Sequence, residues 1–208
     1  MARNIQEKIS DRLLLLYLLD NAWKVGKIEG ITKVQKLVFL SEWAMLDERE
    51  KGFNYNFIKL IHGPYSQQLQ REDVPRLIRA GLINDYNLSP TERAKIILSD
   101  FKELFERNKS FIEKIEEVNR KYAKIPLQKL LQIVYDMPHP YIQGYTISDV
   151  KPTTPLLYKI KENKAKRVFK ITPEEIATLE IYFDTEAFES LLKASRERKS
   201  TLTFQEVF

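Results

Sequence analysis

Five polar side chains between residues 67 and 79 are of the types that read base edges and grip phosphates. Glutamine can bond adenine through two hydrogen bonds, arginine can bond guanine in the same way, and any arginine can neutralise a phosphate. The alternative is that they form only the polar face of an amphipathic helix, which composition alone does not reject. These candidates for DNA contact are Gln67, Gln68, Arg71, Arg76 and Arg79.

The segment that carries these side chains predicts two short helices joined by a tight turn. Because proline breaks a helix interior, Pro75 predicts one helix over 66–71 and a second over 74–80, capped by Asp73. Gly81 then ends the second helix in the left-handed conformation. The residues expected to face the core are Leu69, Val74, Leu77 and Ile78.

The flanking segments complete a winged-helix-like order of elements. An apolar helix is expected up to about residue 50, an alternating strand over 53–59, and a wing of two short strands over 82–88. Lys33 and Lys36 lie off the apolar stripe of that helix, where they either meet phosphate or face water.

Two further helices are predicted to build the core. Residues 5–24 form a helix that is apolar nearly all round, so it is expected at the centre of the fold. A long helix begins at Ser89 and continues to about Lys124, with a heptad pattern that includes Asn108. It either packs on the first helix or forms a coiled-coil dimer, since a buried asparagine is a register device in such dimers.

The charge of the chain is divided unevenly. Residues 1–171 hold 30 Lys and Arg against 21 Asp and Glu, which gives +9, and residues 172–208 hold 4 against 8, which gives −4. The two sums return the net charge of +5. A basic body with an acidic end suggests two partners of opposite charge, and ordinary surface scatter is the alternative.

The C-terminal part divides into a basic segment and an acidic tail. Residues 149–171 have little helical periodicity and are expected to be a linker or an irregular edge segment. Thr172 begins a tail with two amphipathic helices and a terminal extended stretch. Such a tail cannot bury its own apolar residues, so it must dock on its own domain, self-associate or wrap a partner.

Known catalytic and cofactor motifs are missing from the sequence. It has no nucleophile motif, P-loop, GxGxxG or metal-spaced Cys/His cluster, and no cysteine. The only two histidines, His62 and His139, sit in proline turns. We therefore expect a binding protein without cofactor or metal, not an enzyme.

No stretch of the sequence predicts a membrane segment or a secretion signal. The longest apolar run, residues 13–19, is far too short to span a bilayer, and the N-terminal residues lack an apolar signal region. We expect a cytoplasmic protein. The absence of cysteine beside many Lys, Glu and Arg residues fits a thermophilic source.

Three motifs in order resemble the YwgA-like proteins of archaea and bacteria. They are GITKVQKLVFL, HGPYSQQLQREDVPRLIRAGLI and IVYDMPHPYIQGYTI. That family has a T-x-x-Q-K-L helix, a G-P-[YF]-S turn, a G-L-I helix end and a later Val-Tyr pair followed by proline. The chain is more distantly similar to the Panacea (SocA-like) antitoxin domain, which shares the K-x-Q-K-L helix and the G-P turn. The resemblance covers about residues 9–148 and implies a winged-helix-like domain with no known catalysis.

The tail separately resembles the toxin-binding segment of RelB-type antitoxins. Thr178-Leu179-Glu180 and Phe204-Gln205-Glu206-Val207 match that family's T-L-E helix and terminal strand, whereas Ser200 replaces its usual glycine. The resemblance implies that an acidic tail covers a basic, RelE-like ribonuclease toxin. The residues it assigns to toxin binding are Leu179, Ile181, Phe183, Phe188, Leu191, Leu192, Leu202, Phe204, Val207 and Phe208.

These observations together predict a mainly α protein with a minor β part. A winged-helix-like domain is expected over 1–148, a basic linker over 149–171 and a toxin-binding-like tail over 172–208. The expected function is that of an antitoxin in a toxin–antitoxin pair, with possible autoregulation through double-stranded DNA. A DNA-binding regulator with a docked or dimerising tail, a homodimer included, is the alternative, and a module that only binds proteins is a third.

Overall fold

The computed structural model describes residues 2–26, 28–191 and 193–194. It is mainly helical, with 58% helix against 9% strand, as expected for the fold class. Leu192, Leu202, Phe204, Val207 and Phe208 of the expected toxin-binding set lie outside the described residues.

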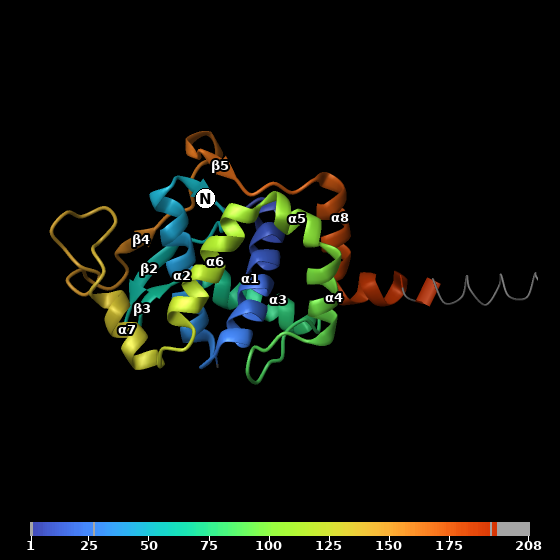
Figure 1. Cartoon of the computed structure of the whole chain (residues 1–208), viewed down its shortest axis with the longest axis horizontal. Coiled ribbons are helices and arrows are strands. Elements are labelled where there is room, and N and C mark those ends of the chain that lie inside the picture. Colours follow the sequence, from blue (N-terminus) through green and yellow to red (C-terminus); the bar gives the residue numbers. More distant parts are fainter. Residues whose placement is uncertain (1, 27, 192, 195–208) are drawn as a thin grey trace, which may run out of the picture.

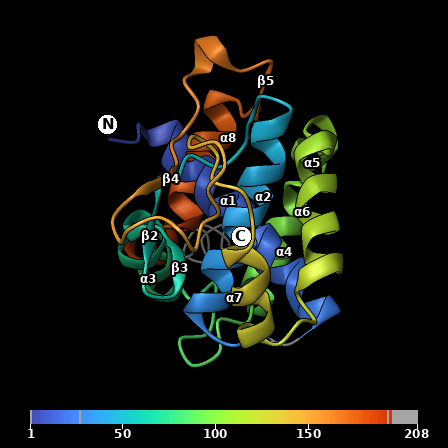
Figure 2. The same ribbon diagram turned by 90° about the vertical axis from the view of Figure 1, so that its left-hand side faces the viewer.

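Two helices form the centre of the fold. α1 (Ile5–Val25) begins with a capping box in which Asn4 and Glu7 bond each other's backbone N–H groups. It buries every residue from Leu13 to Leu16, as its apolar sequence predicts. α2 (Ile31–Asp47) lies against it, and the two views show the hairpin of residues 57–65 on one side of this pair and the helices over 92–107 on the other (Figures 1 and 2).

The β part consists of short strands that join distant segments. β2 (Phe57–Leu60) pairs with β3 (Gly63–Tyr65) as a hairpin and, on its other edge, with β4 (Pro155–Leu157). β1 (Glu50–Lys51) pairs in parallel with β5 (Arg167–Val168). Because β4, β5 and the 3₁₀ turn η2 (Glu162–Lys164) belong to the folded body, residues 149–171 are an irregular edge segment and the linker prediction is wrong.

The predicted long helix is three successive helices. α4 (Glu92–Asp100), α5 (Lys102–Arg107) and α6 (Lys109–Tyr122) are separated by turns at Phe101 and Asn108. The first begins at the cap residue Thr91, not at Ser89. The bends let α4 and α6 both pack on α1, so the intramolecular alternative holds for this segment (Figure 1).

Asn108 fills a core position without a second chain. It is 3% exposed; its side-chain amide donates to the carbonyl of Lys170 at 2.8 Å and accepts from the Lys170 N–H at 2.7 Å. The buried asparagine thus fixes the 167–171 segment to the bend between α5 and α6. The sequence had suggested a different role for it, that of a register device in a coiled-coil dimer.

Two more helices complete the body. α7 (Leu127–Tyr135) begins after Pro126, as predicted, and packs on α2 and β3. α8 (Pro173–Tyr182) begins with the predicted Thr172 capping box and packs on α1. Among the helices that the structure describes, none combines the length and the apolar character needed to cross a bilayer.

Candidate functional site

The helix that carries the expected DNA contacts is continuous over 67–79. A π turn, η1 (Leu69–Asp73), leads into α3 (Val74–Arg79) without a break, and the Val74 N–H donates to the carbonyl of Leu69 five residues back. Pro75 cannot donate the next hydrogen bond, and the π turn is where the backbone absorbs that gap. The helix-turn-helix prediction is therefore wrong. Asp73 has helical φ and ψ and makes no cap hydrogen bond.

The predicted wing is also absent as a pair of strands. Within the described stretch 82–90, the one ladder contact is an isolated bridge between Ile83 and Pro90. Asn84 bends the chain because its side chain accepts from the Tyr86 N–H at 2.9 Å and its carbonyl accepts from the Leu88 N–H at 2.8 Å. Such local bonding competes with strand pairing. Gly81, at φ +66°, ends the helix as expected.

The seven predicted DNA-contacting residues separate into three groups. Gln67, Arg71 and Arg79 are exposed on the helix, as DNA contact requires. Gln68 is half-buried and accepts a hydrogen bond from the Asn56 N–H at 3.0 Å. The other three are engaged within the protein, and they are Lys33, Lys36 and Arg76.

Lys33 and Lys36 are each only 2% exposed. The prediction that they face phosphate or water is therefore wrong. α1, α6, α7 and β3 all pack against α2, which leaves little of that helix at the surface. Lys33 pairs with Glu29 at 3.4 Å. On a helix at the protein surface, residues off the apolar stripe face water. Because α2 is enclosed on most sides, its residues off the stripe are also buried.

A buried ionic cluster replaces the expected helix cap at Asp73. Arg3 donates from Nη1 to Asp73 at 2.5 Å and to Asp11 at 2.8 Å, and Arg12 donates to Asp73 at 2.9 Å. The Tyr55 hydroxyl also donates to Asp73, at 2.9 Å. Burial raises the pKa of Asp11 to about 7, and Arg3 opposes that shift. The cluster ties α1 to η1 and to the segment before β2.

Sequence reasoning missed this cluster, although one signal was present. Asp11 lies two residues before the apolar run of a helix expected at the centre of the fold, so its charge required a buried partner. Nothing local in the sequence identifies Arg3 and Asp73 as the residues concerned.

The three motifs that carry the YwgA-like resemblance meet at the turn 62–66. Gln35 donates to the Ser66 carbonyl at 3.0 Å and accepts from the Ser66 N–H at 2.9 Å. Lys36 donates to the Pro64 carbonyl at 2.7 Å, and the Tyr135 hydroxyl donates to the Ile61 carbonyl. Each motif therefore has a structural role: it fixes the β2–β3 turn against α2 and α7.

The first part of the tail docks on its own domain. Leu179 and Phe183 are 0% and 1% exposed, because α8 packs on α1. They belong to the core, so their assignment to toxin binding is corrected. Ile181 is 36% and Leu191 56% exposed, and both remain available to a partner.

Two arginines hold the root of the next helical stretch. Arg76 donates to the Phe183 carbonyl at 2.8 Å and to Asp184 at 2.7 Å. Arg93 donates to the Tyr182 carbonyl at 3.0 Å and lies 3.8 Å from the ring centroid of Phe188. Beyond this root, residues 185–191 are helical and project from the body on the side of α4 and α8 (Figure 1).

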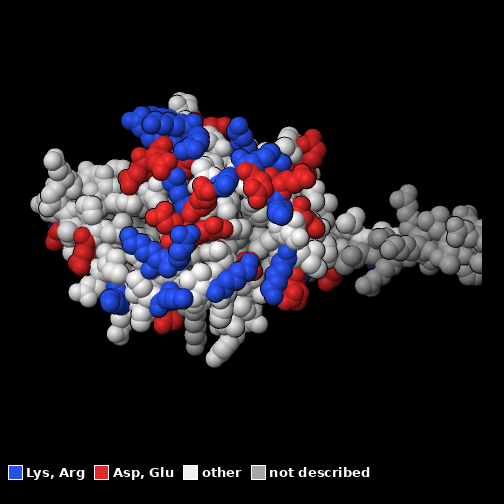
Figure 3. All heavy atoms as spheres, viewed as in Figure 1, with Lys and Arg blue, Asp and Glu red and all other residues white. Residues whose placement is uncertain are grey.

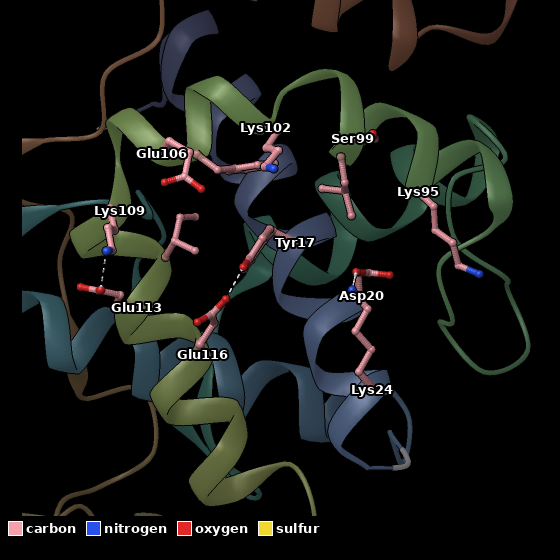
Figure 4. A pocket seen from close by; sticks show the side chains of 13 residues that line it. Tyr17, Asp20, Lys24, Lys95, Ser99, Lys102, Glu106, Lys109, Glu113 and Glu116 are labelled. Carbon is pink, nitrogen blue, oxygen red and sulfur yellow. Dashed lines mark hydrogen bonds and ion pairs between the residues drawn. The ribbon is translucent and has the colours of Figure 1, made fainter.

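A surface cleft of about 610 Å³ lies alongside α1, under the bend of α4–α6 (Figure 4). The Tyr17 hydroxyl donates to Glu116 at 2.5 Å inside it. Two of its lysines pair with carboxylates of the cleft, Lys24 with Asp20 at 2.5 Å and Lys109 with Glu113 at 3.7 Å, and its charged side chains are of both signs. The cleft therefore presents no surface of one sign that would define a ligand class.

Charges of both signs also alternate over the face of the body seen in Figure 3. In the part of the chain that is described, no group of three or more His, Cys, Asp or Glu residues is placed to hold a metal ion. His139, 6% exposed, accepts from the N–H groups of Tyr141 and Ile142, as a polar side chain of a loop does.

Comparison of the chain with protein-family models, with curated proteins and with solved structures gives no match.

Proposed function

We propose that the protein is an antitoxin-type binding protein that captures a small basic protein, a RelE-like ribonuclease, with the exposed part of its tail from Ile181 onward. The observation that carries the proposal is the helical stretch 185–191, which projects from the body and leaves Leu191 56% exposed. Together with Ile181, which is 36% exposed, Leu191 would supply apolar anchors of the kind by which an amphipathic helix binds a groove.

Charge supports a basic partner. Residues 172–191 contain six acidic side chains and no Lys or Arg, and they are Glu174, Glu175, Glu180, Asp184, Glu186 and Glu189. Asp184 pairs with Arg76 and Glu175 with Arg107, whereas Glu186 and Glu189 lie exposed on the projecting stretch. An acidic segment steers and orients a basic protein during association.

The root contacts give the segment a defined starting point. Because Arg76 holds Phe183 and Asp184 and Arg93 contacts Tyr182 and Phe188, the helical stretch 185–191 leaves the body in a fixed direction. A pre-oriented segment loses less conformational entropy on binding. The proposed contacts are therefore Ile181, Phe188 and Leu191, together with the predicted apolar residues beyond 191.

The test is co-expression of the full chain with the product of the adjacent reading frame. We expect a complex that co-purifies and rescue of growth when that product is toxic. A chain ending at residue 183 keeps α8 and should lose both. Leu191→Ser should weaken the complex at least tenfold, whereas Ile142→Ser, an exposed aliphatic residue on a distant loop, should not. No complex and no rescue with the full chain would overturn the proposal.

A second candidate function is that of a regulator that binds duplex DNA through the helix over 67–79. Gln67, Arg71 and Arg79 support it, since they are exposed on one helix next to a β-hairpin. Arg71→Ala with Arg79→Ala should weaken duplex binding and reduce the slope of log K against log salt by about 2. Arg120→Ala, an exposed arginine on α6, is the control. Negligible duplex binding at low salt would leave a module that binds only proteins.

A further inference from the structure

A second pocket, of about 340 Å³, lies between the start of α2 and the β2–β3 turn. Its wall is mostly apolar, with Ile31, Leu60 and Ile61 contributing side chains. Ile61 is 82% exposed at its edge, which is unusual for a large aliphatic residue. The polar residues of the wall are Thr32, Gln35, Lys36, His62, Tyr65 and Gln70.

Lys36 gives this pocket a buried amine with few partners. An ammonium group has three N–H donors, and the structure provides one acceptor, the Pro64 carbonyl at 2.7 Å. Among the described residues, Lys36 forms no ion pair with a carboxylate. Burial lowers the pKa of Lys36 to about 7.

In the described ranges of the chain, no carboxylate faces the Lys36 amine to keep it charged. His62 and Tyr65 come from the hairpin, and the Tyr135 ring from α7 lies 3.7 Å from where a Cβ on Gly63 would stand. On α2 itself, Lys33 is engaged with Glu29. Lys59, whose amine donates to the carbonyls of Ser148 and Val150, lies 6.0 Å from the Tyr135 ring centroid. The charged groups named here are therefore cationic apart from the paired Glu29, which favours an anion over a cation.

Gly63 packs against the stem of Lys36. A Cβ at Gly63 would lie 3.7 Å from Lys36 Cε, so a larger side chain at that position would crowd the stem that leads to the amine. Its φ of +78° is one that glycine adopts without strain. The pocket therefore combines an apolar wall, a glycine backbone beside the Lys36 stem and the Lys36 amine.

We propose that this pocket binds a small carboxylate with an apolar body, whose carboxylate pairs with Lys36 while its hydrocarbon part packs on Ile31, Leu60 and Ile61. The carboxylate supplies the charge partner that the amine lacks, and a hydrogen-bonded pair is the condition under which a buried charge is stable. The volume lies within the range of small-molecule pockets. The site is independent of the tail and of the proposed antitoxin role.

Proton uptake is the signature of this pairing. At pH 8 the Lys36 amine of the free protein is largely neutral, because its pKa lies near 7. An entering carboxylate favours the ammonium form, so binding draws a proton from the buffer. A pocket that holds the hydrocarbon part alone would take up no proton.

The experiment is isothermal titration of the full chain with octanoate at pH 8, in two buffers of different ionisation enthalpy. We expect saturable binding with uptake of close to one proton per octanoate. 1-Octanol, which has the same chain length without the charge, should bind at least tenfold more weakly. Lys36→Met keeps the aliphatic stem and should bind octanoate at least tenfold more weakly without proton uptake.

Two further variants separate the site from general effects. Lys33→Met removes a neighbouring buried amine that does not line the pocket and should leave octanoate binding unchanged. Thr32→Phe, one helical turn from Lys36, fills the pocket and should abolish octanoate binding although the Lys36 amine is retained. If Lys36→Met does not fold, the Nζ chemical shift of Lys36 in the unaltered protein at pH 8 should move from amine to ammonium on titration. Equal binding of octanoate and 1-octanol, absent proton uptake, or no saturation at millimolar octanoate would each overturn the proposal.

Discussion

Arg76 donates from Nε to the carbonyl of Phe183 at 2.8 Å and from Nη2 to the carboxylate of Asp184 at 2.7 Å. The helix that carries the expected DNA contacts is thereby joined to the residue at which the tail leaves the body. One arginine thus belongs to both candidate surfaces, and a partner that moves Asp184 also changes the charge presented by α3.

Replacing Arg76 should loosen the root of the tail without unfolding the body. Both partners are about one-third or more exposed, so Arg76→Ala should cost at most about 1 kcal/mol of global stability. Amide hydrogen exchange of residues 184–191 should become faster. Arg79→Ala, one turn from Arg76 and with an exposed side chain, is the control. Unchanged exchange would show that the root is held without Arg76, by Arg93 and by the hydrogen bond of the Thr185 hydroxyl to the Arg79 carbonyl.

Phe183→Ala should destabilise the whole body, because the ring is 1% exposed in the core. We expect a loss of about 3–5 kcal/mol in the free energy of unfolding, measured by denaturant titration. Ile181→Ala, on the same stretch but 36% exposed, should cost less than about 1 kcal/mol. Similar small effects of both substitutions would mean that α8 is not docked in solution.

Asp73→Asn should remove the centre of the buried ionic cluster. It leaves the Arg3 and Arg12 guanidinium groups with fewer carboxylate partners, and breaking a buried pair costs about 3–5 kcal/mol. Glu72→Gln removes the outer Arg3 partner, whose side chain is 49% exposed, and should cost less than about 1 kcal/mol. The Tm values of the two variants are compared by thermal unfolding. A larger decrease in Tm for Glu72→Gln than for Asp73→Asn would contradict the assigned cluster.

Glu42→Gln should stabilise the protein at neutral pH. Burial raises the pKa of Glu42 well above its usual 4.5, and its Oε2 has no hydrogen-bond partner. Above pH 4.5 the unfolded chain releases a proton that the folded chain keeps, so stability falls as pH rises. Glutamine removes this dependence. Denaturant unfolding of both proteins at pH 4 and pH 7 gives the two unfolding free energies. If the stability gain of Glu42→Gln does not grow from pH 4 to pH 7, the assignment of a buried carboxyl with a raised pKa is wrong.

Lys36→Met should change the pH dependence of stability at alkaline pH. The pKa of Lys36 is lowered from 10.5 to about 7, so between these values the unfolded chain binds the proton and the folded chain does not. Stability from this group therefore rises with pH across that window. Lys36→Met should flatten the rise in unfolding free energy between pH 7 and 10. An identical slope in both proteins would show that the amine stays charged.

Local signals predicted the features that depend on local chemistry. The apolar run of α1, the Thr172 capping box and the left-handed Gly81 are each determined within a few residues, and the structure confirms all three. The antitoxin and DNA-binding functions stay predictions.

Features that depend on distant contacts were not predictable in the same way. The pairing of β2 with β4 joins residues about one hundred positions apart, and periodicity carries no information on such partners. Lys33 and Lys36 were assigned to the surface because charged residues are rarely buried, but enclosure of α2 by α1, α6 and α7 decided otherwise. Asn108 was recognised as a core position, whereas its partner, the Lys170 backbone, lies outside its own helix.

The π turn η1 holds one residue more than an α-helix would need over the same span, because its hydrogen bonds close over five residues instead of four. Gln68 and Asp73 stand at its two ends and are fixed by Asn56 and by Arg3, respectively. A deletion of one residue between these anchors lets the helix return to α-type hydrogen bonds with both ends in register. We therefore expect this stretch to tolerate the loss of one residue better than the gain of one.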